Sequence, residues 1–379
     1  RAGTWTALIL LSGLAIIFLP RQFQIIVVEN VDEAHLKRAV WLFPLYLVAI
    51  NIFVLPLALG GLLHFQGQGF NPDTFVLTLP LARGAESLAL LVFIGGLSAA
   101  TGMVIVETIA LSTMVCNDLV MPWLLRARWL GVGERKDLSG VLLSIRRAAI
   151  ILILLLGYIY FRAAGEAYAL VGIGLISFAA VAQFAPAMFG GMYWKQGTRA
   201  GAVAGLLGGF FVWLYTLLLP SFAKSGWIAN GFVEQGLWGI QALKAQALFG
   251  LSGLDEISHS LWWSFLVNIG LYVLVSLYSK PDAVEAGQAE RFVDVFRHGG
   301  RDTDARLWRG TASVDELVSL LERFLGPFRA RQQLATYAAA QGTSDWHALP
   351  ADAGFVRFAE AQLSGAIGSA SARVMVASV

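Results

Sequence analysis

The most constraining feature of this sequence is a series of apolar, nearly charge-free runs of about 20 residues, the length that crosses the hydrocarbon core of a bilayer. The chain has 379 residues, of which 57% are hydrophobic and only 14% are charged, whereas a soluble protein is about 25% charged. Within a bilayer the backbone polar groups must be hydrogen-bonded inside the protein, which favours helices. The sequence therefore predicts an all-α polytopic membrane protein. It excludes an ordinary soluble enzyme, a nucleic-acid-binding protein and a disulfide scaffold.

Seven of these runs are predicted to be transmembrane helices, and a more polar tail follows them. The last 100 residues contain 11 Lys/Arg and 12 Asp/Glu, against 29 charged residues in the preceding 279. We therefore expect a transmembrane domain over 1–279 and a small cytoplasmic helical domain over 280–379. The predicted spans are 4–20, 39–63, 88–118, 146–162, 167–193, 200–219 and 259–279.

Basic residues are concentrated in alternate connections between the spans. One set of loops carries Arg21, Lys37, Arg38, Arg126, Arg128, Arg135, Lys136, Lys195 and Arg199, and the opposite set carries Arg83, Arg162, Lys224 and Lys244. Loops rich in Lys and Arg stay in the cytoplasm. We therefore expect the first set and the tail to be cytoplasmic. The chain then begins on the outer side, and we expect it to be a fragment of a longer protein.

The tail has helical patterns of its own. Ser313-Val-Asp-Glu316 is a capping-box sequence ahead of an apolar stripe, which predicts the start of a helix. Gly326-Pro327 should end that helix, and 328–340 should form the next. A last helical run is expected from Ala351 to Val379, with one apolar face made of Phe355, Phe358, Ala359, Leu363 and Ile367. Together these segments predict a small helical bundle.

The first predicted span is interrupted by Leu19-Pro20-Arg21-Gln22 before its apolar sequence resumes. A proline removes one backbone hydrogen bond and clashes with the preceding turn. Broken helices expose carbonyl groups and helix ends to substrates in secondary transporters. Pro20 and Gln22 are therefore candidate site residues. The alternative is that Pro20 merely ends the helix at the cytoplasmic surface.

The third predicted span contains unusual polar residues, among them Ser98, Thr101 and Glu107. Hydroxyl oxygens can coordinate a cation, and a carboxylate within a span is a functional candidate by default. Glu107 would relay protons, bind a cation or pair with a buried base. The alternative is a carboxyl group that is protonated, or hydrogen-bonded to a neighbouring helix for packing alone.

Other polar residues of the spans have simpler interpretations. Arg146 and Arg147, at the start of the fourth span, are expected to reach the cytoplasmic headgroups. Asn51 and Asn268 are expected to join helices. The five histidines have no metal-ligand spacing, and no catalytic motif is present. Enzymatic activity stays uncertain, and no catalytic site is predicted.

The sequence from Phe184-Ala-Pro186 through Trp194-Lys-Gln-Gly-Thr198 to Gly201-Ala resembles the sodium:solute symporter family, which includes proline symporters. In that family a helix ends in Trp-basic-x-x-Thr-x-x-Gly-Ala. The end of the third span at Asp118 and the proline in the first span resemble the same family. The resemblance implies that 1–279 is the second half of a LeuT-like inverted-repeat fold, with a small solute and a cation near the midplane.

The resemblance also identifies a departure from the family pattern. When the third span is aligned through Asp118, the family's adjacent Ser and Thr positions are Gly102 and Met103. A Na⁺ site would then lie near Ser98 and Thr101. Coupling to Na⁺ and coupling to H⁺ both stay open.

A second resemblance lies in the tail. The sequence from Phe358-Ala-Glu to Arg373-Val-Met-Val resembles the helical connector of CbrA-type sensor histidine kinases, bacterial proteins that fuse a symporter-like domain to a kinase. The resemblance implies a module of the bacterial inner membrane that senses or transports an amino acid or carboxylate and signals to a kinase domain of the same parent chain. A homodimer is a further expectation.

The alternative is a plain sodium- or proton-coupled symporter with a regulatory tail. If the chain is a sensor, ligand binding is expected to change the tilt of the first span against the third. The seventh span is then expected to transmit this change to the tail.

Overall fold

The structure is a computed structural model that describes residues 2–28, 30, 33–66, 69–126, 138–164, 170–294, 313–343, 346, 350, 352–368, 372 and 375–376. All regular secondary structure in these ranges is helical. This agrees with the predicted all-α class. The longer helices are α1 (Ala2–Phe18), α3 (Glu33–Asn51), α4 (Val54–His64), α6 (Glu86–Met114), α8 (Ser139–Ala164), α9 (Leu170–Val181), α10 (Ala185–Tyr193), α11 (Arg199–Trp213), α14 (Glu256–Tyr278), α15 (Ala283–Val293), α17 (Val314–Leu325), α18 (Pro327–Ala340) and α19 (Ala353–Ile367).

Shorter helical segments continue or connect the longer ones. They are α2 (Pro20–Phe23), η1 (Gln24–Val28), η2 (Pro72–Thr74), α5 (Phe75–Ala82), η3 (Val115–Val120), α7 (Met121–Arg126), η6 (Ala182–Phe184), η7 (Leu214–Leu218), α12 (Leu219–Lys224), α13 (Gly231–Glu234), η8 (Leu237–Gly239), η9 (Gln241–Leu243) and η10 (Leu248–Gly250).

Several helices have the length and composition of membrane spans. Six qualify individually: Ala34–His64, Glu86–Leu124, Ser139–Arg162, Val171–Tyr193, Arg199–Lys224 and Glu256–Tyr278. The bent pair Gly3–Phe18 and Pro20–Val27 makes a seventh if it counts as one span. These helices are those of a multi-pass membrane protein. Helix α8, which contains the fourth predicted span, begins at Ser139. This is seven residues before the predicted start at position 146.

The contacts divide the chain into two compact units that do not follow chain order. Unit 1 contains Arg1–Ile105 and Gly157–Phe296, and unit 2 contains Val106–Leu156 and Arg297–Val379. The predicted domain boundary between 279 and 280 lies where the content of charged residues changes, whereas the two units are defined by the contacts within each. Helix α15, although it lies beyond that boundary, belongs to unit 1.

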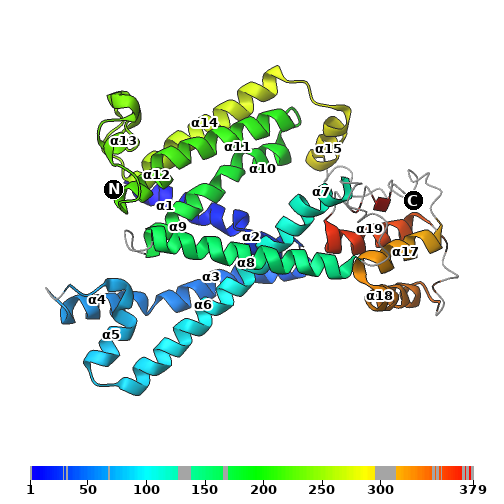
Figure 1. Ribbon diagram of the computed structural model, residues 1–379, viewed down its shortest axis with the longest axis horizontal. Helices are drawn as coiled ribbons and strands as arrows, with labels where there is room; N and C mark the ends of the chain where they lie inside the picture. The colour runs from blue at the N-terminus through cyan, green and yellow to red at the C-terminus, as the bar shows by residue number, and fades with distance from the viewer. Residues whose placement is uncertain are drawn as a thin grey trace. The chain divides into compact units, whose positions relative to one another are not determined.

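In unit 1, α11 and α14 pack side by side (Figure 1). Gly201, Gly205 and Gly209 recur every fourth residue on α11 and are buried. The facing row on α14 also recurs every fourth residue and consists of Ser260, Ser264, Asn268, Tyr272 and Ser276, all buried. Small residues at this spacing let two helix backbones approach closely. Gly201 and Gly205 thus allow α11 and α14 to pack closely.

Unit 2 has a hydrophobic core that joins the tail helices to the ends of the third and fourth predicted spans. Cys116 and Met121 contribute from η3 and α7, and Leu138 and Leu142 contribute from the start of α8. The backbone N–H of Leu138 donates to the carbonyl of Arg323 at 2.8 Å. The tail supplies Leu317, Val318, Leu320, Leu321, Phe324, Ala330, Leu334, Ala338, Phe355, Val356, Ala359, Leu363, Ile367, Ala372 and Val376. This packing explains why α8 begins before the charge-free part of its sequence.

The predicted start of the first tail helix is confirmed. Ser313 and Glu316 form the reciprocal capping box of α17. Hydrogen bonds from the backbone and hydroxyl of Ser313 hold the pKa of Glu316 below its ordinary value. Gly326 then separates α17 from α18, as predicted.

The predicted apolar face of the last helix is also confirmed, because Phe355, Ala359, Leu363 and Ile367 are buried and Phe358 packs, partly buried, against the same core. The expected uninterrupted helix from Ala351 to Val379 is wrong. Helix α19 ends at Ile367, where Gly368 has a φ of 83°, a conformation that glycine adopts without a steric penalty. The part of the prediction that covers 351, 369–371, 373–374 and 377–379 lies outside the described residues.

The seventh span continues into α15, which packs on α10 within unit 1. Lys195 and Asp294 form an ion pair beside this contact. The sequence predicts that the seventh span carries a signal into the tail. Within unit 2, however, the tail helices pack on the ends of the third and fourth spans.

Candidate functional site

The first span is broken at Pro20. Leu19 is extended, with φ −64° and ψ 130°, and Pro20 opens the new helix α2. The segments Gly3–Phe18 and Pro20–Val27 meet at 51°. Proline disfavours helical backbone at the residue before it and suits the first turn of a helix. The predicted interruption is confirmed, and the chain continues as helix beyond Pro20 rather than ending there. Gln22 lies in this short helix and is half-buried.

The other predicted site residues lie on α6. Ser98 and Thr101 are exposed, and the Thr101 hydroxyl donates to the carbonyl of Leu97 at 2.7 Å. Glu107 is half-buried and belongs to unit 2, whereas Pro20, Gln22, Ser98 and Thr101 belong to unit 1. A cation held near Ser98 and Thr101 would need oxygen ligands from beyond α6. The proposed roles of these residues stay predictions.

A polar junction attaches the broken helix to α14. The Asp255 carboxylate accepts hydrogen bonds from the Thr4 hydroxyl at 2.8 Å, from the Ser258 backbone at 3.1 Å and from the Ser258 hydroxyl at 2.7 Å. Asp255 is thus the N-cap of α14 and also binds α1. Partial burial would raise the pKa of Asp255, but the hydrogen bonds from Ser258 and Thr4 outweigh burial and lower it below 3.8.

We expect Asp255→Ala to destabilise unit 1 by about 1 kcal/mol at pH 7, the usual cost of losing an N-cap. Because the folded-state pKa is lowered, the stabilisation by Asp255 is present above its ordinary pKa and is lost as the pH falls through the folded value. The difference in melting temperature between the variant and the parent should therefore shrink below about pH 4. Thr4→Val, which keeps the cap, should cost less at pH 7. A difference that does not change between pH 7 and pH 3 would contradict this account.

Two cavities adjoin this junction. One, of about 570 Å³, lies between α1 and α14 and is mostly apolar, with Thr6 and Ser258 among its polar lining residues. The other, of about 550 Å³, is lined by Asp255, Glu256 and Gln246 together with apolar residues. The Nε2 of Gln246 is buried and has no hydrogen-bond partner among the described residues. The second cavity therefore combines carboxylates with an amide donor, groups that suit the ends of a small zwitterionic solute.

A buried polar cluster lies deeper in unit 1, where η6 interrupts the fifth span. The Gln183 amide donates to the Ser264 hydroxyl at 2.9 Å, and the Asn268 amide donates to the Gln183 carbonyl at 2.8 Å. The Asn268 Oδ1 is buried without a partner among the described residues. The second bond gives the Gln183 backbone carbonyl a partner within the span, where an unpaired carbonyl would be costly. The expectation that Asn268 joins helices is confirmed.

Asp255 and Gln183 were not among the residues predicted from the sequence. Asp255 could have been found as the Asp-x-x-Ser pattern that opens the last apolar run. Gln183 could have been found as a lone amide in a predicted span, three residues before Pro186. Their partners lie far away in sequence, so the sequence alone does not show what they bind.

Among the described residues, no group of three or more His, Cys, Asp or Glu side chains is arranged to hold a metal ion. His259 is buried in α14, and its Nε2 accepts a hydrogen bond from the backbone of Leu248 at 3.1 Å. Comparison with protein-family models, characterised proteins and solved structures finds no match to this chain.

Proposed function

We propose that this chain is the membrane module of a sensor that binds a small nutrient, an amino acid or carboxylate, together with a cation, and signals through its helical tail to a kinase domain of the same parent chain. The observation that carries the proposal is the shared core of unit 2, in which Leu142 of α8 and Leu138, the residue before α8, pack among the tail helices. A packed core transmits displacement because it has little free volume. A movement of the third or fourth span would therefore move the tail.

A second candidate function is a plain sodium- or proton-coupled symporter with a regulatory tail. The broken helix at Pro20 favours it, since discontinuous helices bind solutes in secondary transporters. The two cavities beside Thr6 and Asp255 offer space for a small solute. In this case the core of unit 2 would only stabilise the transporter.

The two functions differ in what a solute does to the parent protein. We would reconstitute the full-length protein in liposomes and measure uptake of labelled amino acids with and without Na⁺, and phosphorylation by ATP in parallel. A sensor should change its phosphorylation at least severalfold when the solute is added. Uptake without any change in phosphorylation would favour the symporter and contradict the first proposal.

Glu107→Gln is expected to lower both solute-dependent uptake and solute-dependent phosphorylation by about tenfold, because an amide cannot carry the proton or charge of an intramembrane carboxylate. Glu86→Gln is a matched control on the same helix, since Glu86 is exposed in the first turn of α6. It should leave both readouts unchanged. If Glu107→Gln has no effect on either readout, Glu107 has no part in the mechanism.

A further inference from the structure

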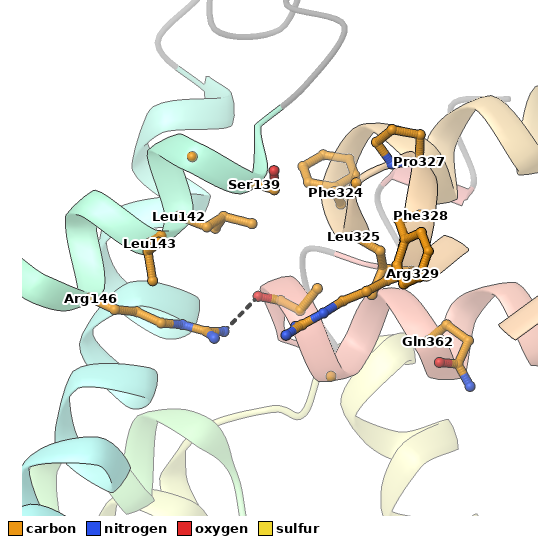
Figure 2. Close-up of a pocket in the computed structure, with 14 residues that line it drawn as sticks. Ser139, Leu142, Leu143, Arg146, Phe324, Leu325, Pro327, Phe328, Arg329 and Gln362 are labelled. Carbon is orange, nitrogen blue, oxygen red and sulfur yellow. Dashed lines mark hydrogen bonds between the residues drawn. The ribbon is translucent and has the colours of Figure 1, made fainter. Parts of the chain in front are cut away.

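Unit 2 contains a cavity that the proposed function does not use. It has a volume of about 660 Å³ and lies where the start of α8 meets the α17–α18 turn and the end of α19. Its polar lining residues are Ser139, Arg146, Arg329 and Gln362 (Figure 2). None of its 14 lining residues is acidic.

Two arginines converge on this cavity. Figure 2 shows Arg146, from α8, and Arg329, from α18, extending from opposite sides toward the same region. One guanidinium nitrogen of Arg146 donates to the carbonyl of Ala366 at 3.0 Å, and its Nε is buried and has no hydrogen-bond partner in the described part of the chain. Neither arginine forms an ion pair with a carboxylate among the described residues. Two guanidinium groups that face one cavity repel each other unless an anion lies between them.

The surrounding groups add neutral donors. Ser139 and Gln362 supply a hydroxyl and an amide. The 14-residue helix α18 begins at this cavity, and no side chain caps its N-terminus. Backbone N–H groups in the first turn of a helix favour an anion. The donors therefore match a phosphate group, which guanidinium groups bind through paired hydrogen bonds.

The cavity also lies at the expected level of the membrane surface. Arg146 and Arg147 directly precede the charge-free sequence 148–161 of α8, which is roughly 21 Å long at 1.5 Å per residue. Two apolar side chains of the cavity wall are exposed, Phe328 by 82% and Leu143 by 50%. An acyl chain would cover such side chains.

We propose that this cavity binds a phosphate group, carried either by an anionic membrane lipid or by a free phosphate compound. Arg146 and Arg329 hold the phosphate oxygens, and Ser139 and Gln362 donate further hydrogen bonds. Because the bound group contacts α8, α18 and α19 together, it stabilises the attachment of the tail to the fourth span. The proposal is independent of the solute and of the kinase.

The test uses the full chain, purified in a neutral detergent at fixed ionic strength. Thermal unfolding is measured while short-chain phosphatidylglycerol, short-chain phosphatidylcholine or inorganic phosphate is added in separate titrations. Phosphatidylglycerol should raise the melting temperature in a saturable manner, and phosphatidylcholine should not. If inorganic phosphate alone gives the same stabilisation, the phosphate group is sufficient. If only phosphatidylglycerol acts, the ligand is a lipid.

Variants assign the effect to the cavity. Arg329→Gln and Arg146→Gln should each weaken the apparent affinity by about tenfold or more, because each removes charge-assisted hydrogen bonds. Arg147→Gln is the matched control, since Arg147 is exposed, adjacent and outside the cavity lining. Arg329 is exposed, so its variant should fold even if Arg146→Gln does not. The proposal is overturned if neither phosphatidylglycerol nor phosphate stabilises the protein, if phosphatidylcholine acts equally, or if Arg147→Gln weakens binding as much as Arg329→Gln.

Discussion

Replacing Phe355 with alanine should lower the free energy of opening of unit 2 by about 3–5 kcal/mol, the usual cost of deleting a buried phenyl group. Phe355 is 1% exposed, and its ring centroid lies 5.9 Å from that of Tyr337. Its removal leaves a cavity in the core that joins α17, α18 and α19 to α8. Hydrogen–deuterium exchange of the amides in α17–α19 measures this loss locally, without unfolding the membrane helices.

Phe328→Ala provides the matched control, because it makes the same chemical change at a side chain that is 82% exposed. Its effect on amide exchange in α17–α19 should stay within about 0.5 kcal/mol. If Phe355→Ala leaves exchange unchanged, or if the two variants lose the same protection, the core described for unit 2 is wrong. If the sensor proposal is correct, Phe355→Ala should also abolish solute-dependent phosphorylation while uptake continues.

The second large effect is expected at the contact between α11 and α14 in unit 1. A Cβ at Gly205 would lie 2.6 Å from the backbone oxygen of Asn268. A backbone atom cannot turn aside as a flexible side chain does, so Gly205→Ala must separate the two helices. We expect a loss of about 2–3 kcal/mol, since overpacking of a well-packed contact costs this much. For a unit of this size the melting temperature should fall by roughly 5–10 °C.

Gly270→Ala is the control for this variant, because a Cβ at Gly270 of α14 meets nothing within 4 Å. Alanine is the better helix former by about 1 kcal/mol, so this variant should be neutral or slightly more stable. Both variants would be measured by thermal unfolding in the same detergent. Equal losses for the two variants would show that helix propensity, not the α11–α14 contact, sets the effect of Gly205→Ala.

Features that depend on neighbouring residues in the chain could be predicted from the sequence. The membrane helices follow from runs of apolar residues, and the start of α17 follows from Ser313 and Glu316, which are three residues apart. The break at Pro20 follows from the chemistry of proline itself. The predicted last helix is too long because its helical pattern continues past Gly368 in the sequence, whereas the conformation of Gly368 ends α19.

The candidate sites could be predicted only in part. Thr4 and Asp255 are 251 residues apart in sequence, yet they form the junction between α1 and α14. Arg146 was expected to reach the lipid headgroups, but the structure shows it bonded to the carbonyl of Ala366 in α19. Both contacts depend on which helices pack together, and a single sequence contains no record of such pairings.

The helical, multi-pass character of this protein and its polar helical tail follow from the amino-acid sequence, because the cost of placing charge and unbonded backbone in hydrocarbon acts on each segment separately. Two features depend on how the helices pack: the tail shares its core with the ends of the third and fourth spans, and two arginines distant in sequence line one cavity. The physical reason is that burial of an apolar face needs a partner face, and which partner is available is settled only when the helices pack.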